Sequence, residues 1–449
     1  MREAVKSKKK QDTYPDDSND KMLEVLQRRT FSYFLEQANE HTGLIADKTQ
    51  PGSHSSIAAT GIGISCYVVG IERGFIKRAE AVKRTHKVLK FLLNSQQSTE
   101  VDATGYKGFY YHFLDMDTGK RARKSELSTI DTAILLAGVL TARYYYTGDN
   151  KSETEIRKYA DELYERVDWQ WALNGKDSIV HGWKPESGFL RSRWNMKYSE
   201  AHLIYIMAIG SPTFPISSSI YEKWTSTFEW VKIYDIECIY AGPLFIHQMS
   251  QIWLDFKGIH DSFNQKIGID YFENSGRATQ IQQLYAIDNP LNYPHYGKNG
   301  WGFTASEGPG PATRVVDGVK RKFYDYIARG APYGPDDGTI SPWAVVTSLP
   351  FLPKEILSTM NHAIGQLEDY DEHHEYGFDA SFNLSFRDKK DKSKSWISEW
   401  QFGLNQGPII LMIENYKTGL IWDIIKNSPH IIDGLQKAGF TGGWLDSKK

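Results

Sequence analysis

The chain has 449 residues, with 53 Lys and Arg against 55 Asp and Glu, and a formal net charge of −2. This balance argues against a nucleic-acid footprint, an anionic membrane partner and phosphate-rich substrates. The sequence contains no run of about eighteen apolar residues that would span a membrane.

The first twenty residues are polar and lack the apolar core of a signal peptide. We expect a disordered segment over residues 1–20, left after removal of a signal, and a single domain over 21–449. Cys66 and Cys238 lie far apart in apolar stretches. They could form a disulfide, but two buried free thiols fit this spacing better.

Amphipathic segments alternate along the chain with segments that are apolar on most faces. Amphipathic helices belong on an outside, whereas helices apolar all round must be surrounded by protein. Six such pairs predict an all-α fold with an inner ring of helices inside an outer ring. The outer segments are Lys21–Ala38, Lys77–Asn94, Glu153–Asp168, Ser219–Trp230, Ile269–Ile287 and Lys354–Leu367. The inner segments are Ser55–Glu72, Ser128–Tyr146, Glu200–Gly210, Pro243–Phe256, Ser341–Leu349 and Gln406–Trp422.

The connecting segments hold most of the irregular structure. A strand-like segment, Gly108–Leu114, and a long aromatic loop, Trp169–Tyr198, interrupt the helices, and Ile431–Ala438 closes the ring. The longest irregular stretch, Asp288–Gly338, is dense in Gly and Pro. Loops of this length inside a compact domain are usually functional.

Carboxylates occur where several inner helices begin. If these helices run in parallel, Asp131, Glu200, Glu399 and the pair Asp336 and Asp337 share one rim. Glycoside hydrolysis needs two carboxyl groups on opposite sides of the scissile bond. The chain is also 13% aromatic, and aromatic rings stack well on sugars. The pattern therefore indicates a sugar-cleaving rim.

Each of these acids also has a structural interpretation. Asp131 follows Ser128 by three residues, so a capping box and a catalytic role are equally compatible with it. A carboxylate at position 200 would be stabilised by the helix dipole. Its aromatic and apolar neighbours, however, would raise the pKa of Glu200, as a general acid requires.

Other acids and the histidines carry weaker signals. Asp336 and Asp337 precede a glycine in an apparent turn, where Asp commonly binds backbone amides. Glu399 lies between two tryptophans, and a sugar contact or a solvated acid fits equally well. The acidic stretch Asp371–Glu375 (DEHHE) favours a solvated loop over a metal site. His247 is more typical of a core histidine than of a catalyst, and no cofactor or metal is expected.

Many consecutive motifs resemble one bacterial family. They include FLDMDTGKR, ELSTIDTAILLAG, GWKPESGFL, YSEAHLIYIMAIGSP, GPLFIHQMSQIWLDFKGI, DYFENSGRAT, WGFTASEGP, RGAPYGPDDGTISP and LNQGPIILMIENYKTGLIW. In this order, from about Phe31 to Phe440, they are similar to the family long labelled "putative glucoamylase". Its characterised members are endo-β-1,2-glucanases of glycoside hydrolase family 144, and a related region lies within cyclic β-1,2-glucan synthases.

The resemblance implies an (α/α)6 barrel and an inverting hydrolase that cuts linear β-1,2-glucan into sophoro-oligosaccharides. It gives Glu200 the role of general acid, and Asp131 matches an acidic position of the family's pocket. Candidate general bases are Asp131, Asp379 and Glu399. Candidate substrate contacts come from the aromatic and Gly/Pro-rich loops and the inner helices: Trp183, Phe189, Arg193, Trp194, Tyr198, His247, Trp301, Glu307, Arg329, Asp337 and Trp400.

Two positions depart from the family pattern, because Asn405 and Ala380 stand where acids are common. An α-glucan exo-hydrolase and a non-catalytic β-glucan-binding protein therefore stay open as alternatives. The resemblance also implies a periplasmic or secreted protein, and we expect a monomer whose partner is the glucan itself.

Overall fold

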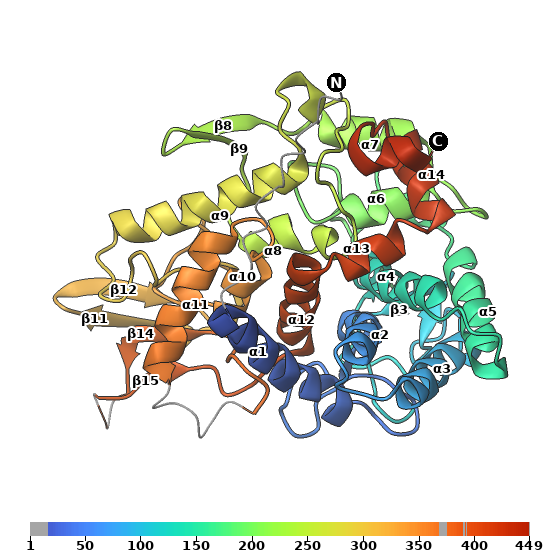
Figure 1. Ribbon diagram of the computed structural model, residues 1–449, viewed down its shortest axis with the longest axis horizontal. Coiled ribbons are helices and arrows are strands. Elements are labelled where there is room, and N and C mark those ends of the chain that lie inside the picture. Colours follow the sequence, from blue (N-terminus) through green and yellow to red (C-terminus); the bar gives the residue numbers. More distant parts are fainter. Residues whose placement is uncertain (1–16, 368–374, 389–390, 392, 449) are drawn as a thin grey trace, which may run out of the picture.

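The computed structural model describes residues 17–367, 375–388, 391 and 393–448 of the chain. Helices dominate this part, as predicted, and nearly fully buried ones alternate with partly exposed ones (Figure 1). The buried helices are α2 (Ile57–Glu72), α4 (Thr129–Tyr145), α6 (His202–Ile209), α8 (Leu244–Gln248), α10 (Pro342–Thr347) and α12 (Gly403–Lys417). The partly exposed helices are α1 (Asp17–Glu36), α3 (Arg78–Asn94), α5 (Lys151–Glu165), α7 (Ser218–Thr225), α9 (Tyr271–Asp288) and α11 (Pro353–Leu367).

The buried helices pack side by side. Helix α2 lies between α4 and α12, α4 also contacts α6, and α10 contacts both α8 and α12. Beyond α8, Ser250 accepts a hydrogen bond from the Leu203 amide of α6 at 3.1 Å, which links these two helical segments as well. The inner segments therefore follow one another around a common centre.

Glycines allow α2 and α4 to approach at backbone distance. A Cβ atom on Gly138 would lie 1.9 Å from the carbonyl oxygen of Gly61, and one on Gly61 would lie 2.3 Å from the Cα of Leu135. No other residue fits at such a spacing, because the contact is with main-chain atoms that cannot move aside. The small residues of these apolar helices therefore fix how closely they pack.

Short antiparallel strands lie where the buried helices begin. A five-stranded sheet has the order β2 (Gly105–Tyr106), β3 (Phe109–Tyr111), β5 (Leu127–Ser128), β6 (Gly182–Lys184), β7 (Gly188–Phe189). Strand β1 (Ser55–Ser56) pairs with β4 (Phe113–Leu114). Strands β1 and β5 lead directly into α2 and α4, and Ser56 and Ser128 cap these helices. The sheet thus covers the N-terminal ends of the buried helices.

The remaining strands form hairpins and small pairs. These are β8 (Trp230–Ile233) with β9 (Ile236–Ile239), β10 (Ala305–Ser306) with β13 (Ile327–Ala328), β11 (Ala312–Val316) with β12 (Val319–Phe323), and β14 (Phe382–Arg387) with β15 (Ser395–Ile397). The stretch predicted as irregular, Asp288–Gly338, therefore contains two strand pairs. Its Gly and Pro residues hid the alternation of exposed and buried residues along β12.

Three predicted helices end earlier than expected. Gln406–Trp422 is two helices, because Gly419 adopts a left-handed φ of 73° and α13 (Leu420–Ile425) starts after it. Ser219–Trp230 ends as α7 at Thr225, since Trp230 begins a strand. In Pro243–Phe256, α8 is followed by a 3-10 helix at Ser250–Ile252. The chain closes with α14 (Pro429–Lys437) and a 3-10 helix at Gly443–Lys448, and further 3-10 helices lie at Trp171–Leu173 and Asn264–Lys266.

Some expectations concern residues that are not described. The polar segment 1–20 lies outside the described residues except for 17–20, which are helical and belong to α1. The acidic stretch Asp371–Glu375 lies outside them except for Glu375. Cys66 and Cys238 are both buried and free, as the spacing favoured. Among the described helices, none has both the length and the apolar character needed to cross a bilayer.

Candidate active site

Three carboxylates lie where buried helices begin. Asp131 is in the first turn of α4, where its backbone amide donates to Ser128 Oγ at 3.2 Å. Glu200 comes just before α6. Asp47 precedes α2 in sequence, and its carbonyl accepts a hydrogen bond from the amide of Gly403, at the start of α12, at 3.0 Å. The fold therefore gathers acids from three parts of the chain at one end of the buried helices.

Glu200 has the properties of a proton donor. Burial raises the pKa of its carboxyl to about 7, and the charge on Asp131 adds to the rise, while its own backbone amide opposes it. The residue is nevertheless half-buried, so solvent reaches it. Its backbone is held by Ser250, whose hydroxyl donates to the Glu200 carbonyl at 2.6 Å. A carboxyl with a pKa near 7 still carries a proton on about half of the molecules at neutral pH.

His112 links Asp131 to a further acid. Its Nδ1 lies 3.1 Å from Glu126 Oε1 and 3.7 Å from Asp131 Oδ2. Burial lowers the pKa of the imidazole, but the carboxylates of Asp131, Glu126 and Asp47 together raise it to about 9. The hydrogen bond with His112 lowers the pKa of Glu126 to about 2. At neutral pH the site therefore contains an imidazolium between carboxylates.

Asp47, His112 and Glu126 were not singled out from the sequence, because none of them stands at the first residues of a predicted inner helix. The antiparallel strands brought two of them together: the amide of His112 donates to the carbonyl of Glu126 at 2.9 Å. The strand-like segment Gly108–Leu114 was the available signal, but its strand partner could not be read from the sequence. Burial raises the pKa of Asp47, although the charges of His112, Arg123 and Lys48 lower it.

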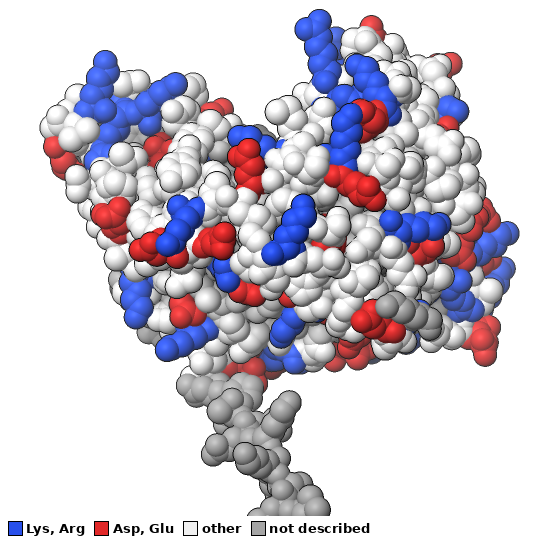
Figure 2. Space-filling view, turned by 90° about the horizontal axis from the view of Figure 1, so that it is seen from above, with Lys and Arg blue, Asp and Glu red and all other residues white. Residues whose placement is uncertain are grey.

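A tyrosine marks an open cleft beside these acids. Protein atoms around Tyr326 raise the pKa of its hydroxyl to about 12, and the charges of Asp47, Asp131 and Glu307 add to the rise. Even so, 62% of Tyr326 is exposed. A side chain that is surrounded by protein and yet accessible lies in a hollow. Tyr326 lines a groove with residues 311–313 and 322–327. Figure 2 shows a hollow in the molecular outline, between two raised parts that both carry Lys and Arg side chains.

Glu307 lies at this end of the molecule. Its carboxylate lies 3.5 Å from Lys48 Nζ and accepts a hydrogen bond from Ser398 Oγ at 2.8 Å. Ser398 also donates to the carbonyl of Trp400, a half-buried residue, at 3.1 Å. Ser398 therefore links Glu307 to Trp400 by hydrogen bonds, and Lys48 provides a positive charge near the Glu307 carboxylate.

The other two candidate bases differ in exposure. Glu399 is exposed on the segment before α12. Asp379 is half-buried and follows Phe378, whose carbonyl accepts from Gln406 Nε2 in the first turn of α12 at 2.9 Å. The departures from the family pattern are both buried, with Ala380 1% and Asn405 8% exposed. At the start of α12 the structure thus places an amide where a carboxylate was expected.

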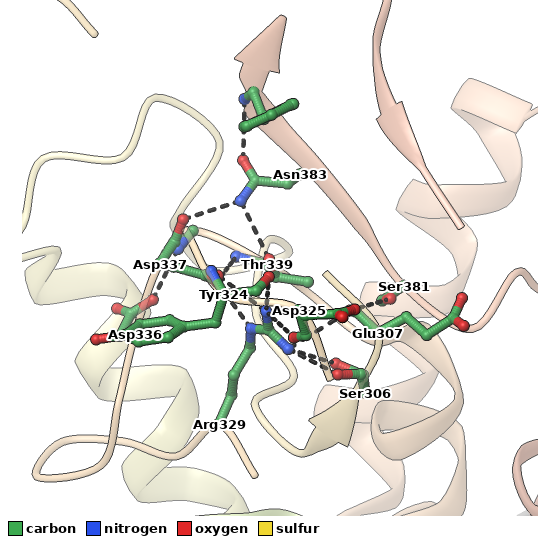
Figure 3. Close-up of polar contacts among 12 residues, drawn as sticks. Ser306, Glu307, Tyr324, Asp325, Arg329, Asp336, Asp337, Thr339, Ser381 and Asn383 are labelled. Carbon is green, nitrogen blue, oxygen red and sulfur yellow. Dashed lines mark hydrogen bonds and ion pairs between the residues drawn. The ribbon is translucent and has the colours of Figure 1, made fainter. Parts of the chain in front are cut away.

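Arg329 and Asp337 form a fully buried ion pair, which corrects their expected role as substrate contacts. Arg329 Nε and Nη2 donate to the two carboxylate oxygens of Asp337 at 2.8 and 2.9 Å (Figure 3). The guanidinium also donates to the carbonyls of Ser306 and Tyr324. Both residues are 0% exposed, so no ligand reaches them. The guanidinium holds the pKa of Asp337 below its usual value despite the burial that would raise it.

Asp336, next to this pair, is also engaged with protein groups. It accepts hydrogen bonds from the hydroxyls of Tyr296 at 2.5 Å and Tyr285 at 2.9 Å, and from the amide of Gly338 at 2.9 Å. Asp336 therefore binds a backbone amide in the turn, as expected.

Trp301 and His247 are likewise buried and are removed from the set of substrate contacts. Each is 1% exposed. Trp301 donates from its indole to Thr359 at 3.3 Å, and His247 hydrogen-bonds to the carbonyl of Ala241 at 3.1 Å. Trp301 packs in a hydrophobic cluster, whereas the His247 ring lies among polar groups that include Asn274 Nδ2 at 3.5 Å.

Trp194, Tyr198 and Arg193 support the wall behind Glu200. Trp194 and Tyr198 are 8% and 6% exposed, and the Trp194 indole donates to Thr129 at the start of α4 at 3.0 Å. Arg193 donates to the hydroxyl of Ser178 at 2.8 Å. Trp194 therefore holds the long aromatic loop against the start of α4, and Trp194 and Tyr198 offer a ligand little surface, whereas Arg193 is half-buried and ties parts of the loop together.

Trp183 and Phe189 present more of their surface. Both are half-buried on the paired strands β6 and β7, and both contact Trp171, with ring centroids 6.0 and 4.8 Å away. Tyr106 packs on Trp183 at 5.4 Å. This aromatic cluster lies on the five-stranded sheet that also contains β3, the strand that ends just before His112. In the described part of the chain, no group of three His, Cys, Asp or Glu residues could hold a metal ion.

The comparisons with known proteins match the chain to one family model, one curated relative and several solved structures. A family model described as "Putative glucoamylase" matches residues 192–429. The curated exo-β-1,2-glucooligosaccharide sophorohydrolase (non-reducing end) of Parabacteroides distasonis is 30% identical over 95% of the chain. The chain spans only 58% of that relative's length.

Solved structures match over nearly the whole chain. A putative glucoamylase from Bacteroides uniformis is 31% identical, with a TM-score of 0.83, and the match covers 95% of this chain and 98% of that one. The endo-β-1,2-glucanase from Chitinophaga pinensis, solved with sophorotriose and glucose, is 26% identical with a TM-score of 0.80. That match covers 94% of this chain and 99% of the glucanase.

Proposed function

This chain belongs to the family described as "Putative glucoamylase", and from that premise we propose that it is an inverting glycoside hydrolase of linear β-1,2-glucan. The single observation that carries the proposal is the half-buried Glu200 carboxyl, whose pKa of about 7 leaves it partly protonated beside Asp131. The β-1,2-glucan activity of the sophorohydrolase and the endoglucanase names the substrate class.

In the proposed mechanism Glu200 is the general acid. It donates its proton to the glycosidic oxygen as the bond from that oxygen to the anomeric carbon breaks. A water molecule attacks the anomeric carbon from the opposite face, and its proton passes to a carboxylate. Inverting enzymes leave room for this water by separating the two carboxyl groups by roughly 6.5–9.5 Å.

Asp131 is the proposed base, directly or through a further water molecule. It lies beside the His112 imidazolium, whose Nδ1 is 3.7 Å from Asp131 Oδ2. His112 is in turn held by Glu126. Asp379 is the second candidate base, since it is half-buried near the start of α12, and the exposed Glu399 is the third.

We propose that cleavage is internal, giving sophoro-oligosaccharides, as in the endoglucanase. A second candidate is release of sophorose from the non-reducing end, because the sophorohydrolase is 30% identical. We further propose that residues 21–449 form one (α/α)6-barrel domain, that the chain is monomeric, and that it acts in the periplasm or outside the cell.

Product analysis on linear β-1,2-glucan tests the proposal. We expect a series of sophoro-oligosaccharides to appear early in the reaction, whereas exo-cleavage would give sophorose alone from the first time point. Glucose released from maltodextrin would instead identify an α-glucan hydrolase. Binding of glucan without any product, by a folded protein, would reject hydrolysis and favour a glycan-binding role.

A further inference from the structure

A groove beside the β11–β12 hairpin is not used by the proposed chemistry. It has a volume of about 490 Å³ and is lined by residues 311–313 and 322–327. Small-molecule sites commonly enclose roughly 300–1,000 Å³, so the groove has room for sugar units. We propose that this hairpin groove is an additional subsite that binds glucose units of a long glucan chain beyond the bond being cleaved. The proposal rests on the proposed function.

The lining has the chemistry that recognises a sugar. Tyr324 and Tyr326 contribute aromatic rings, and Thr313, Lys322 and Asp325 contribute a hydroxyl, an amine and a carboxylate. The apolar face of a glucose ring stacks on an aromatic ring, while its hydroxyls exchange hydrogen bonds with such polar groups. Lys322 Nζ lies over the Tyr324 ring, 4.8 Å from its centre, so the amine covers one face of that ring and the exposed Tyr326 ring offers the stacking face.

Tyr326 connects the groove to the candidate active site. It lines the groove, is 62% exposed, and lies within electrostatic reach of Asp47, Asp131 and Glu307. Asp131 is the proposed base, and Glu307 is held by Lys48 and Ser398 at the same end of the molecule. In the proposal, a glucan chain extends from the acids near Asp131 to the groove across the Tyr326 ring.

The buried ion pair holds the floor of the groove in place. Arg329 Nη2 donates to the carbonyls of Tyr324 and Asp325, both at 3.1 Å, and Asp337 accepts from the amide of Tyr324 at 2.9 Å (Figure 3). Arg329 also donates to the carbonyl of Ser306 at 2.7 Å.

The same network holds the Glu307 segment. The backbone carbonyl of Glu307 accepts from Ser381 Oγ at 2.8 Å, whereas its carboxyl points away from Arg329 (Figure 3). One network of buried bonds thus fixes both the groove floor and the backbone at Glu307. A wall already ordered before binding costs little conformational entropy when a flexible polymer binds.

The test compares a long substrate with a short one. Steady-state kinetics of the wild type, Tyr326→Ala and Tyr326→Phe are measured on linear β-1,2-glucan and on the shortest sophoro-oligosaccharide that the wild type cleaves. We expect Tyr326→Ala to lower kcat/KM for the polymer about tenfold more than for the short substrate, mainly through KM. Tyr326→Phe keeps the ring and should recover most of that difference.

Lys320→Ala is the matched control, because Lys320 is exposed on the same hairpin but does not line the groove. It should leave both substrates unaffected. An equal loss on the two substrates, or no loss, for Tyr326→Ala would overturn the groove proposal while leaving the proposed function standing.

If the wild type cleaves neither substrate, the proposed function is wrong, but the groove proposal can still be tested. Calorimetric titration of the wild type and Tyr326→Ala with the same two glucans then measures whether the groove binds glucan. Weaker polymer binding by Tyr326→Ala supports the groove. Equal polymer binding by the two proteins, or no binding by either, overturns it.

Discussion

Glu200 and Asp337 are both acids near helix starts, but they lie in opposite environments. Asp337 is sealed from solvent and paired with Arg329 in two hydrogen bonds, so its pKa is held below the usual value. Glu200 is reached by solvent, has the charge of Asp131 nearby, and has a pKa raised to about 7. A carboxylate matched with a guanidinium supports the fold, whereas one beside another carboxylate retains a proton that it can donate.

The largest expected effect is the loss of turnover when Glu200 is replaced. Glu200→Gln removes the transferable proton and should lower kcat on β-1,2-glucan by about 100- to 10,000-fold, while the variant stays at least as stable as the wild type. Initial rates and thermal melts of the same preparation check it. The control is Glu222→Gln, an exposed acid on α7, which should keep wild-type rates. Retained activity in Glu200→Gln would assign the proton donor elsewhere.

For Asp337, by contrast, breaking the ion pair with Arg329 should destabilise the folded protein rather than remove a catalytic group. Arg329→Met leaves the Asp337 carboxylate buried without its partner, and we expect a loss of about 3–5 kcal/mol in the free energy of unfolding. Urea denaturation followed by circular dichroism measures it. The double variant Arg329→Met with Asp337→Leu removes both charges and should recover part of the loss. A single variant as stable as the wild type would contradict a structural role for the pair.

A smaller effect is expected at His112. Replacing it by Gln removes the positive charge between Glu126 and Asp131, and should lower kcat roughly tenfold. The pH–rate profile separates this from a packing defect. Loss of the charge should displace the pH dependence of the rate, whereas a mere packing defect lowers the rate equally at every pH. An unchanged rate and profile would remove His112 from the site.

The smallest effect concerns pH. The pKa of Glu200 is about 7 in the folded chain and 4.5 in its unperturbed state, so the folded state binds the proton more tightly. Its contribution to stability is therefore fully present below about pH 4.5 and is lost as the pH rises through about 7.

Because solvent screens the half-buried carboxyl, only part of the shift counts, and Glu200→Gln should gain about 1–2 kcal/mol of stability relative to the wild type as the pH rises from 4.5 to 8. Denaturation midpoints of both proteins across that range measure it. Activity of the wild type should fall above about pH 7 for the same reason. Parallel stability curves for the two proteins would contradict the raised pKa.

Helix identity was readable from the sequence to a large extent, because it depends on local periodicity. The apolar runs became α2 and α4 within two residues of their predicted bounds, since each segment's faces are fixed by its own side chains. The prediction failed at Gly419, where one left-handed glycine splits the last segment. It also failed in Asp288–Gly338, where β11 and β12 form a hairpin and β10 pairs with β13.

What the sequence determined by itself was the alternation of buried and exposed helices and the candidacy of Glu200, because both follow from neighbours along the chain. Only the tertiary structure decided which acids share an environment. Strand pairing places His112 next to Glu126. The fold pairs Asp337 with the guanidinium of Arg329, whereas the charge near Glu200 is the carboxylate of Asp131. A carboxyl group's pKa depends on burial and on charges within a few ångströms, and those charges come from residues far apart in sequence.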